Sequence, residues 1–347
     1  MQEQGRVAVV IVNFNGAEHV SECLEALRSQ TFKDFFAVVL DNGSSDGSPE
    51  LIASGFPEVE LVRSPENLGF AAGNNRVIDT CLARDGVDCV LTLNNDVVME
   101  PDCLEKMVAA LDGSARAWSC QPKMYLARGW AEPVLNNTGI IVWRDGSAFN
   151  RGINEPDTGQ YDGATDIFGT CAGCSLYRAG VLSETGLFDE SFFAYLEDVD
   201  LAWRGRLLGH SSVFCPEAVC WHRHGATATD PARKISLVEA NRIKVLVKNY
   251  ALFDILLSPL FTSYRMARLV MLGLSGGEDA GRLETYQGDL GPAALARAVL
   301  VGWLQGLKAV RACLGQRRAF YSKRVAAPRA RRLARKYSGR LTDLLSR

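Results

Sequence analysis

The chain has 347 residues, of which 47% are hydrophobic and 22% charged, and its formal net charge is −2. This composition is typical of a globular protein that is soluble or attached to a membrane surface. The first apolar run, residues 7–12, is too short for a secretory leader or a spanning helix and predicts a β-strand. Ten cysteines lie mostly within apolar runs, which favours buried free thiols in a reducing cytoplasm.

Short β-branched runs alternate with helical stretches along the first third of the chain. We predict strands at 7–12, 35–41 and 87–93, and helices at 17–29, 70–83 and 102–111. This alternation predicts an α/β fold with a largely parallel sheet covered by helices on both faces. The three strands end in the polar segments NFNG, DNGSSDGS and NNDVV. Such ends converge on one crevice of an open α/β sheet, where ligands bind.

The middle of the chain, from residue 118 to about 163, is rich in Gly, Asn and Pro and predicts short antiparallel strands and loops. A helix is predicted at 197–208, because acids occupy its first turn and Gly209 follows its last. Strand signals disappear beyond Pro231. We therefore predict a catalytic domain at 1–231, with a nucleotide-binding half to about 115 and an acceptor half from 116, followed by a helical region at 232–347.

The C-terminal region contains two predicted amphipathic helices, at 258–274 and 292–313. In the first, Ser258 and Pro259 form the predicted N-terminus. Thr262, Arg265 and Arg268 fall on one side of a helix that is otherwise apolar. Because charges interrupt this stretch, we expect it to lie in a membrane interface and not to cross the bilayer.

The end of the chain is strongly basic. Residues 311–347 contain 12 Lys or Arg and one acid. A basic tail attracts phosphate, either of nucleic acid or of anionic lipid. The tail lacks a nucleic-acid-reading fold, so we expect an anionic membrane surface and no nucleic acid. Disorder and helices that form a homo-oligomer stay open as alternatives.

Carboxylates gather at the predicted strand ends. Asp96 follows two asparagines, and further acids form the clusters Asp41 with Asp46, and Glu197 with Asp198 and Asp200. An acid after a strand is commonly only a turn residue. Three acidic clusters around one crevice suit a divalent cation that prefers oxygen ligands, or hydrogen-bond donors on a bound ring.

Six motifs, in order, carry a resemblance to a known family: VAVVIVNFNG, VLDNGSSDGS, ENLGFAAGNN, LTLNNDVVM, GLFDESFFAYLEDVDLAWR and AVCWH. Together they resemble the family 2 glycosyltransferases, which have the GT-A fold, and are most similar to the bacterial rhamnosyltransferase-like branch. The resemblance covers roughly residues 6–250. It implies a Rossmann-like, mostly parallel mixed sheet between helices that binds a nucleoside-diphosphate sugar.

The resemblance also implies which residues bind the donor: Val12, Asn13, Asn15, Asp41, Asn67, Gly69, Asn74, Asn95 and Asp96. Asp41 would accept a hydrogen bond from a pyrimidine N3–H, which a carboxylate does with discrimination. Gly69 would permit close approach of backbone to the nucleotide. The alternative for ENLGFAAGNN is an ordinary loop that leads into a helix.

The metal-binding Asp-x-Asp motif of the family corresponds to Asn94-Asn95-Asp96, so the first acid is replaced here. The resemblance implies that Asp96 holds Mg²⁺ or Mn²⁺, with the diphosphate supplying most ligands. Asn95 would then be free to reach ribose or phosphate. His222 is the expected further ligand, His224 the less favoured one, and an imidazole ligand would favour Mn²⁺. We expect weak or donor-dependent metal binding.

Asp198 is the candidate general base, and Glu197 is expected to orient either the acceptor or Asp198. Inverting transfer requires one group to take a proton from the acceptor hydroxyl, and a carboxylate within hydrogen-bond reach can do so. A helix N-terminus would fix its direction and stabilise its ionised form. The alternative is an acidic first turn with no catalytic role.

These residues predict an inverting, metal-dependent glycosyltransferase on the inner face of the cell membrane. We expect dTDP-rhamnose as donor, then UDP-sugars such as UDP-galactofuranose or UDP-GlcNAc, and a cell-envelope glycan or lipid-linked acceptor. The alternatives are a non-catalytic sugar- or membrane-binding module and hydrolysis by two carboxylates. A nicotinamide-dependent oxidoreductase is disfavoured, because NFNGAEHV has one glycine where G-x-G-x-x-G is needed.

Overall fold

The computed structural model describes residues 5–126, 133–223, 230–275, 290–324 and 327–338. The chain divides into two compact units. Unit 1 comprises Met1–Ile140, Asn150–Gly205 and Gly209–Ala228, and unit 2 comprises Ile141–Phe149, Arg206–Leu208 and Thr229–Arg347. The segments 141–149 and 206–208, which the sequence assigned to the catalytic domain, therefore belong to the C-terminal unit.

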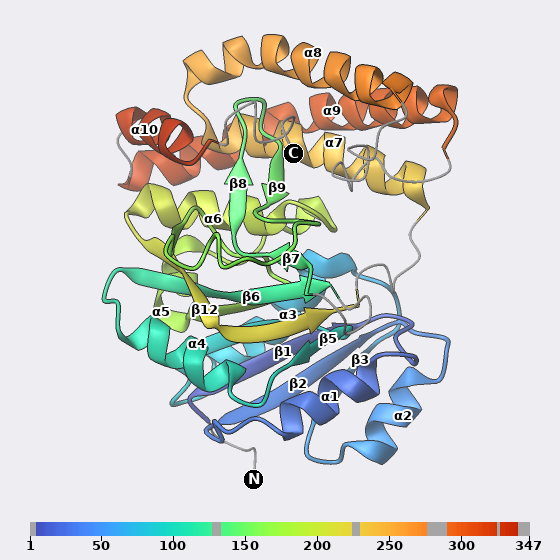
Figure 1. Ribbon diagram of the computed structural model, residues 1–347, viewed down its shortest axis with the longest axis vertical. Helices are drawn as coiled ribbons and strands as arrows, with labels where there is room; N and C mark the ends of the chain where they lie inside the picture. The colour runs from blue at the N-terminus through green and yellow to red at the C-terminus, as the bar shows by residue number, and fades with distance from the viewer. Residues whose placement is uncertain (1–4, 127–132, 224–229, 276–289, 325–326, 339–347) are drawn as a thin grey trace. The chain divides into compact units, whose positions relative to one another are not determined.

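Unit 1 is built around a mixed sheet with the main order β10-β12-β6-β11-β4-β1-β2-β3, in which β5 also pairs with β12 and β7 with β6 (Figure 1). Strands β4, β1, β2 and β3 are parallel, whereas β11 is antiparallel to both of its neighbours. The strands are β1 Val7–Asn13, β2 Phe35–Asn42, β3 Glu60–Ser64, β4 Cys89–Asn94, β5 Val97–Met99, β6 Ala117–Leu126, β7 Leu135–Asn137, β10 Asp166–Ile167, β11 Cys174–Arg178 and β12 Ser211–His222. The predicted mixed, mostly parallel α/β sheet is confirmed.

Helices cover both faces of this sheet, and the central strands are buried on both sides. In β1, Val7, Val9 and Ile11 join one apolar core, while Ala8 and Val10 join the other. Since side chains alternate along a strand, burial on both faces requires an unbroken apolar run such as VAVVI. The helices of unit 1 are α1 Val20–Arg28, α2 Ser48–Gly55, α3 Gly69–Leu82, α4 Cys103–Asp112, α5 Ala179–Thr185 and α6 Glu197–Leu208, with a short 3₁₀ turn at Glu190–Phe192.

Strand β6 departs from the prediction of short antiparallel strands in this part of the chain. It is ten residues long, buried throughout, and parallel to β12. The polar residues of β6 interrupt the apolar pattern by which a buried strand is predicted, but they form hydrogen bonds or ion pairs inside the unit. The Ser119 hydroxyl donates to the Ser212 hydroxyl at 2.8 Å, and Lys123 Nζ lies 2.9 Å from Asp157 Oδ2 and 2.7 Å from Asp162 Oδ1.

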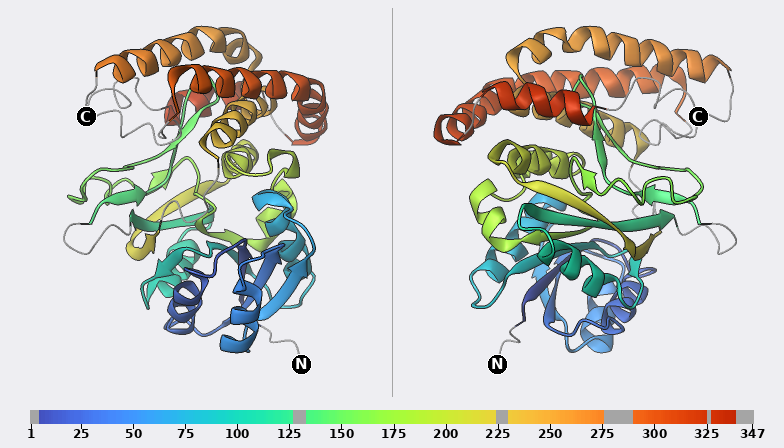
Figure 2. Two further views of the ribbon diagram at one scale, coloured as in Figure 1. Left: turned by 90° about the vertical axis from the view of Figure 1, so that its right-hand side faces the viewer. Right: turned by 60° about the vertical axis from the view of Figure 1, so that its left-hand side comes forward.

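Unit 2 is mainly helical, as predicted, and its described helices are α7 Pro231–Asn249, α8 Leu252–Ser275, α9 Pro292–Arg324 and α10 Ala327–Tyr337, with strands β8 Ile140–Val142 and β9 Ala148–Asn150 (Figures 1 and 2). Helix α9 packs closely on α7 because two of its residues lack side chains. A Cβ added at Gly302 would lie 2.5 Å from the Ser236 carbonyl oxygen, and one at Gly306 would lie 2.8 Å from Ile243.

Helix α8 begins earlier than predicted, at Leu252, so that Pro259 lies inside it and not in its first turn. Proline has no N–H and leaves the carbonyl one turn earlier without a backbone donor. Here the Ser258 hydroxyl donates to the Ile255 carbonyl at 2.8 Å, which replaces the lost hydrogen bond. In the described part of the chain, one helical stretch, Pro292–Tyr321, is long and apolar enough to cross a membrane by length and composition alone.

Candidate active site

The polar ends of three neighbouring strands meet at one edge of the sheet, as the sequence predicts. Asn13, the last residue of β1, is in register with Asp41 of β2, and Val12 is in register with Asn94 of β4. The side chains that follow these strands therefore line the carboxyl edge of the parallel strands, which is the ligand-binding edge of open α/β sheets.

Asn13 and Asn95 are hydrogen-bonded to each other at this edge. The Asn13 amide donates to Ser48 Oγ at 2.8 Å, and its Oδ1 accepts from Asn95 Nδ2 at 2.8 Å. One amide hydrogen of Asn95, which was expected to reach ribose or phosphate, is thus donated to Asn13, while the amide carries a second hydrogen and an oxygen that this contact does not use. Gly16 lies against this pair, since an added Cβ would fall 2.1 Å from Asn95 Nδ2. No sequence signal marked Gly16 as necessary, although it follows NFN directly.

A second set of contacts holds the loop after β2. Asn15 has a left-handed backbone, with φ of 49°, and its Oδ1 accepts from the Ser45 amide at 2.9 Å. Asp46 accepts hydrogen bonds from the Ala17 amide at 2.8 Å and from the backbone amide and the hydroxyl of Ser48. Burial opposes ionisation of Asp46, but these hydrogen bonds lower its pKa below the usual value. Asn15 and Asp46 thus shape the loop that follows β2, the strand that carries Asp41.

Asp41 itself is only 4% exposed, and its Oδ1 accepts no hydrogen bond from the described residues. A buried acceptor without a donor is costly, which is the property expected of a group that binds a ligand N–H. Nearby, Asn67 is exposed, and its Oδ1 accepts from the Gly69 amide at 2.8 Å and from Asn42 Nδ2 at 3.1 Å. Asn74, in contrast, is buried in α3 and donates to the Phe70 carbonyl.

Asp96 and His222 meet at the end of β12. His222 Nε2 lies 3.2 Å from Asp96 Oδ1, and His222 Nδ1 lies 3.1 Å from Asn136 Oδ1. Because an amide oxygen only accepts, the Nδ1–H of His222 donates to Asn136 Oδ1, and Nε2 faces the Asp96 carboxylate. Two acceptors this close require a proton or a cation between them. Asn136 was not predicted, because nothing near it in the sequence marks it as a partner of His222.

The separation of these two atoms fits a shared cation. Metal–ligand distances of about 2.0–2.2 Å place adjacent ligands at right angles about 3 Å apart. Asp96 is 6% exposed; burial opposes its ionisation, but the hydrogen bond and charge of His222 lower its pKa. Among the described residues, no group of three or more His, Cys, Asp or Glu could hold a metal. Asp96 and His222 would be two of its ligands, and His224 lies outside the described residues.

Asp198 lies in the first turn of helix α6, and both of its carboxylate oxygens accept hydrogen bonds. Its Oδ2 accepts from the Ala172 amide at 3.1 Å and its Oδ1 from the Val199 amide at 2.7 Å. Ala172 belongs to a small-residue loop that also contacts the Asn94-Asn95-Asp96 segment, because the Asn94 amide donates to the Gly173 carbonyl at 2.8 Å. This loop connects the candidate base with the end of β4, which Asp96 follows.

Burial dominates the protonation of the two adjacent acids. It raises the pKa of Asp198, although the amides of Ala172 and Val199 oppose the shift. The pKa of Glu197 rises further, first because of burial and then because of the Asp198 charge, and its buried Oε2 accepts no hydrogen bond from the described residues. The expected stabilisation of ionised Asp198 at the helix N-terminus is therefore outweighed by desolvation, and of the two acids Glu197 has its pKa raised more strongly.

The segment before α6 is strained and is attached to α3. Phe193, Tyr195 and Leu196 have positive φ angles of 62°, 71° and 66°. The Phe193 carbonyl accepts from the amides of Phe70 and Ala71, at 2.7 and 3.1 Å, which are otherwise unpaired donors in the first turn of α3. The N-terminus of α3, where Gly69 lies, thus holds the chain that leads into Asp198.

The family model "Glycosyl transferase family 2" matches residues 8–186, which is more than half of the chain. The chain belongs to glycosyl transferase family 2. This glycosyltransferase is 29% identical over 245 residues to the N-acetylglucosaminyl-diphospho-decaprenol L-rhamnosyltransferase of Mycobacterium tuberculosis (strain CDC 1551 / Oshkosh), covering 66% of this chain and 80% of that protein. The predicted resemblance to the rhamnosyltransferase-like branch is confirmed.

A further relative is the low-salt glycan biosynthesis hexosyltransferase Agl10 of Haloferax volcanii, 23% identical over 58% of this chain and 61% of that protein. Among solved structures, the glycosyltransferase resembles GalNAc-T7 with UDP, GalNAc and Mn²⁺ (TM-score 0.56, 13% identity, 72% of this chain) and S. aureus TarS (TM-score 0.51, 15% identity, 96% of this chain). It spans 48% and 55% of those two chains. These likenesses show the shared GT-A fold.

Proposed function

We propose that this glycosyltransferase is an inverting, metal-dependent enzyme that transfers a sugar from a nucleoside diphosphate to a hydroxyl of a cell-envelope glycan or lipid-linked acceptor. The best candidate donor is dTDP-rhamnose, followed by a UDP-sugar. The name of the mycobacterial relative, an L-rhamnosyltransferase acting on a decaprenol-linked sugar, supports the rhamnosyl donor and the lipid-linked acceptor; its similarity extends over 66% of this chain.

The pairing of Asp198 with Glu197 supports the inverting mechanism. Asp198 would accept the proton of the acceptor hydroxyl as its oxygen attacks C1 of the donor sugar and the bond from C1 to the diphosphate breaks. The leaving diphosphate takes the bonding electrons, and a single displacement inverts C1. The amides of Ala172 and Val199 hold the carboxylate in one direction, while the raised pKa of Glu197 disfavours a second negative charge beside it.

The donor would lie along the carboxyl edge of the sheet, with its base against the unpaired Asp41 Oδ1 and its diphosphate near Asp96. Asp96 and His222 would hold Mg²⁺ or Mn²⁺, and the imidazole favours Mn²⁺. When bound, the cation neutralises charge that develops on the leaving diphosphate. Asn136 would keep the His222 ring in the orientation that offers Nε2.

We further propose that the enzyme works at the inner face of the cell membrane, to which its C-terminal unit attaches peripherally. The basic residues between 311 and 347 support this location, since each Lys or Arg near an anionic leaflet contributes about 1 kcal/mol. A lipid-linked acceptor would be presented at that surface.

A donor panel tests the proposal: dTDP-rhamnose, UDP-galactofuranose, UDP-GlcNAc, UDP-galactose and GDP-mannose, each with Mg²⁺ or Mn²⁺, with released nucleotide as the readout. We expect turnover with one donor, dependence on the metal, and an inverted product linkage by NMR. Asp198→Asn should lower kcat by at least about a hundredfold, whereas Asp79→Asn, at an exposed position of α3, should not.

Absence of turnover with every donor, while nucleotide still binds, would indicate a non-catalytic module instead. Sugar release from a glycan without any nucleotide would indicate hydrolysis.

A further inference from the structure

Helix α8 exposes a face without charge. The exposed residues of its described part lie on one side of the helix: Leu252, Phe253, Leu256, Pro259, Leu260, Ser263, Tyr264, Ala267, Val270 and Met271. Three leucines on this side are exposed by 67%, 78% and 69%, in the order 252, 256 and 260. A contiguous exposed apolar patch of this kind marks a contact surface.

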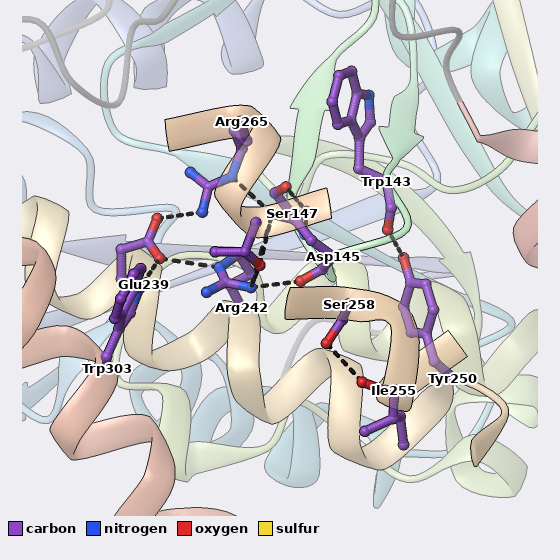
Figure 3. A network of polar contacts seen from close by, with 11 residues as sticks. Trp143, Asp145, Ser147, Glu239, Arg242, Tyr250, Ile255, Ser258, Arg265 and Trp303 are labelled. Atoms are coloured by element: carbon purple, nitrogen blue, oxygen red, sulfur yellow. Dashed lines mark hydrogen bonds and ion pairs between the residues drawn. The ribbon is translucent and has the colours of Figure 1, made fainter. Parts of the chain in front are cut away.

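The polar side of α8 is turned into unit 2. Arg265 is 4% exposed; its Nε donates to Asp145 Oδ2 at 2.7 Å and its terminal nitrogen to Glu239 Oε1 at 2.8 Å (Figure 3). Arg242 donates to Glu239 Oε2 at 3.0 Å and to the Asp145 carbonyl at 2.6 Å, and Trp303 Nε1 donates to Glu239 Oε2 at 2.7 Å. The charge of Arg265 is thus paired with two carboxylates inside unit 2.

This arrangement is the reverse of an ordinary soluble helix, whose apolar side faces the core and whose charges face water. The sequence predicts that Arg265 lies on the polar side of an otherwise apolar helix at 258–274 that lies in a membrane interface. The structure buries that side and exposes the apolar side, and the described residues of unit 2 leave this face largely exposed.

The charge beside the exposed face indicates what that contact is. From residue 290 to 338 the chain has no acid. Arg331 of α10 lies over the ring of Phe253 on α8, with its guanidinium carbon 4.6 Å from the ring centre. Further exposed cations of α9 and α10 are Lys308, Arg311, Arg318, Arg329, Arg332 and Arg335. A second copy would bring the same positive charge to the contact, whereas anionic lipid complements it.

We propose that α8 lies in the plane of a bilayer that contains anionic lipid, with the face of Leu252, Leu256 and Leu260 inserted among the acyl chains and the neighbouring cations at the headgroups. This inference deepens the proposed membrane location by moving the main contact from the basic tail to a folded helix face. An uncharged exposed side flanked by Lys and Arg is the pattern of interfacial helices.

The test is flotation of the full-length protein with vesicles of phosphatidylcholine alone or mixed with phosphatidylglycerol. The variant Leu256→Glu/Leu260→Glu places two acids on the face, at positions that are largely exposed and therefore compatible with folding. The matched control, Ala53→Glu/Thr80→Glu, adds the same charge at exposed positions of α2 and α3 in unit 1. We expect the wild type and control to float with the anionic vesicles, and the α8 variant to lose about tenfold or more in partition.

Flotation of the α8 variant equal to that of the wild type would overturn the proposal, as would failure of the wild type to float with either vesicle. If the wild type is instead a stable dimer in solution that the α8 variant dissociates, the face binds a second copy and the proposal is wrong. Donor turnover measured without vesicles separates this inference from the proposed activity. The α8 variant should keep that turnover, and a wild type that floats without turnover would refute only the activity.

Discussion

The contact between Gly69 and Phe193 provides a sharp test of how the candidate base is positioned. Gly69 has φ of +82°, and a Cβ added there would lie 2.5 Å from Phe193 Cδ2 and 2.7 Å from the Phe193 carbonyl oxygen. Gly86 has nearly the same backbone angle, φ of +84°, but nothing lies within 4 Å of its added Cβ. Both Gly69→Ala and Gly86→Ala therefore introduce backbone strain, but only Gly69→Ala also introduces a steric clash.

The shared strain of a left-handed alanine is about 1–2 kcal/mol, so Gly86→Ala should lose that much stability. Gly69→Ala should lose a further 1–3 kcal/mol or so, because a methyl group must enter a filled space. At roughly 2–4 °C per kcal/mol for a unit of this size, the Tm of Gly69→Ala should fall several degrees below that of Gly86→Ala. The clash moves the Phe193 carbonyl, and with it the left-handed segment that begins α6 before Asp198.

Thermal unfolding and kcat with the active donor are the two measurements. We expect kcat of Gly69→Ala to fall at least about tenfold, since displacement of a catalytic group by an ångström can cost a hundredfold, and kcat of Gly86→Ala to stay near the wild-type value. The double variant Gly69→Ala/Phe193→Ala should lose less stability than the sum of the single variants. Equal Tm and equal kcat for the two glycine variants would refute the link between α3 and the base.

Replacement of Asn136 by Ala should raise the metal concentration for half-maximal activity about 10–100-fold, because the His222 ring loses its orienting partner; an unchanged metal titration would contradict this role. The pH–rate profile should show an acid limb above the ordinary aspartate pKa of about 3.9, since burial raises the pKa of Asp198, and Glu197→Gln should leave that limb in place. The pKa of Glu197 is higher in the folded than in the unfolded state, so Glu197 destabilises the fold increasingly as the pH rises from the unfolded pKa to the folded pKa. Glu197→Gln should therefore raise Tm more at pH 8 than at pH 4. An equal change of Tm at both pH values would count against a raised pKa of Glu197. Arg265→Met leaves two buried carboxylates short of a partner and should cost roughly 3–5 kcal/mol of stability by urea unfolding, whereas a loss below 1 kcal/mol would show that the network is not needed.

The polar ends of the strands were the part of the candidate site that could be predicted from the sequence. An unbroken apolar run followed at once by Asn13, Asp41 or Asn94 has a simple physical origin, since a doubly buried strand must become polar where it leaves the sheet. The register between neighbouring strands then brings these ends together. The partner of His222 could not be found in this way. Asn136 lies 86 residues from it in the chain, and only the pairing of β6 with β7 and β12 brings the two close.

Two predictions were incomplete, because a local sequence pattern does not show which residues of other elements lie beside it. Asn95 was expected to be free because Asp96 would hold the metal in the family motif, but one of its two amide hydrogens is donated to Asn13. The wheel of α8 correctly separated polar from apolar residues, yet amphipathicity does not say which side meets the protein. That depended on Asp145 and Glu239, which lie in other elements of unit 2.

The irregular pairing of β12 with β6 has a consequence for how this site tolerates changes in chain length. Cys215 pairs with Pro122 and Val219 with Lys123, so three residues of β12 bulge out between consecutive pairs. From Val219 to His222 the register is regular, and His222 lies opposite Val97, next to Asp96. One residue inserted after Val219 would turn His222 to the other face of the strand, whereas an insertion within the bulge can loop out. Natural variation in length among relatives should accumulate at residues 216–218 and be absent from the four residues that follow.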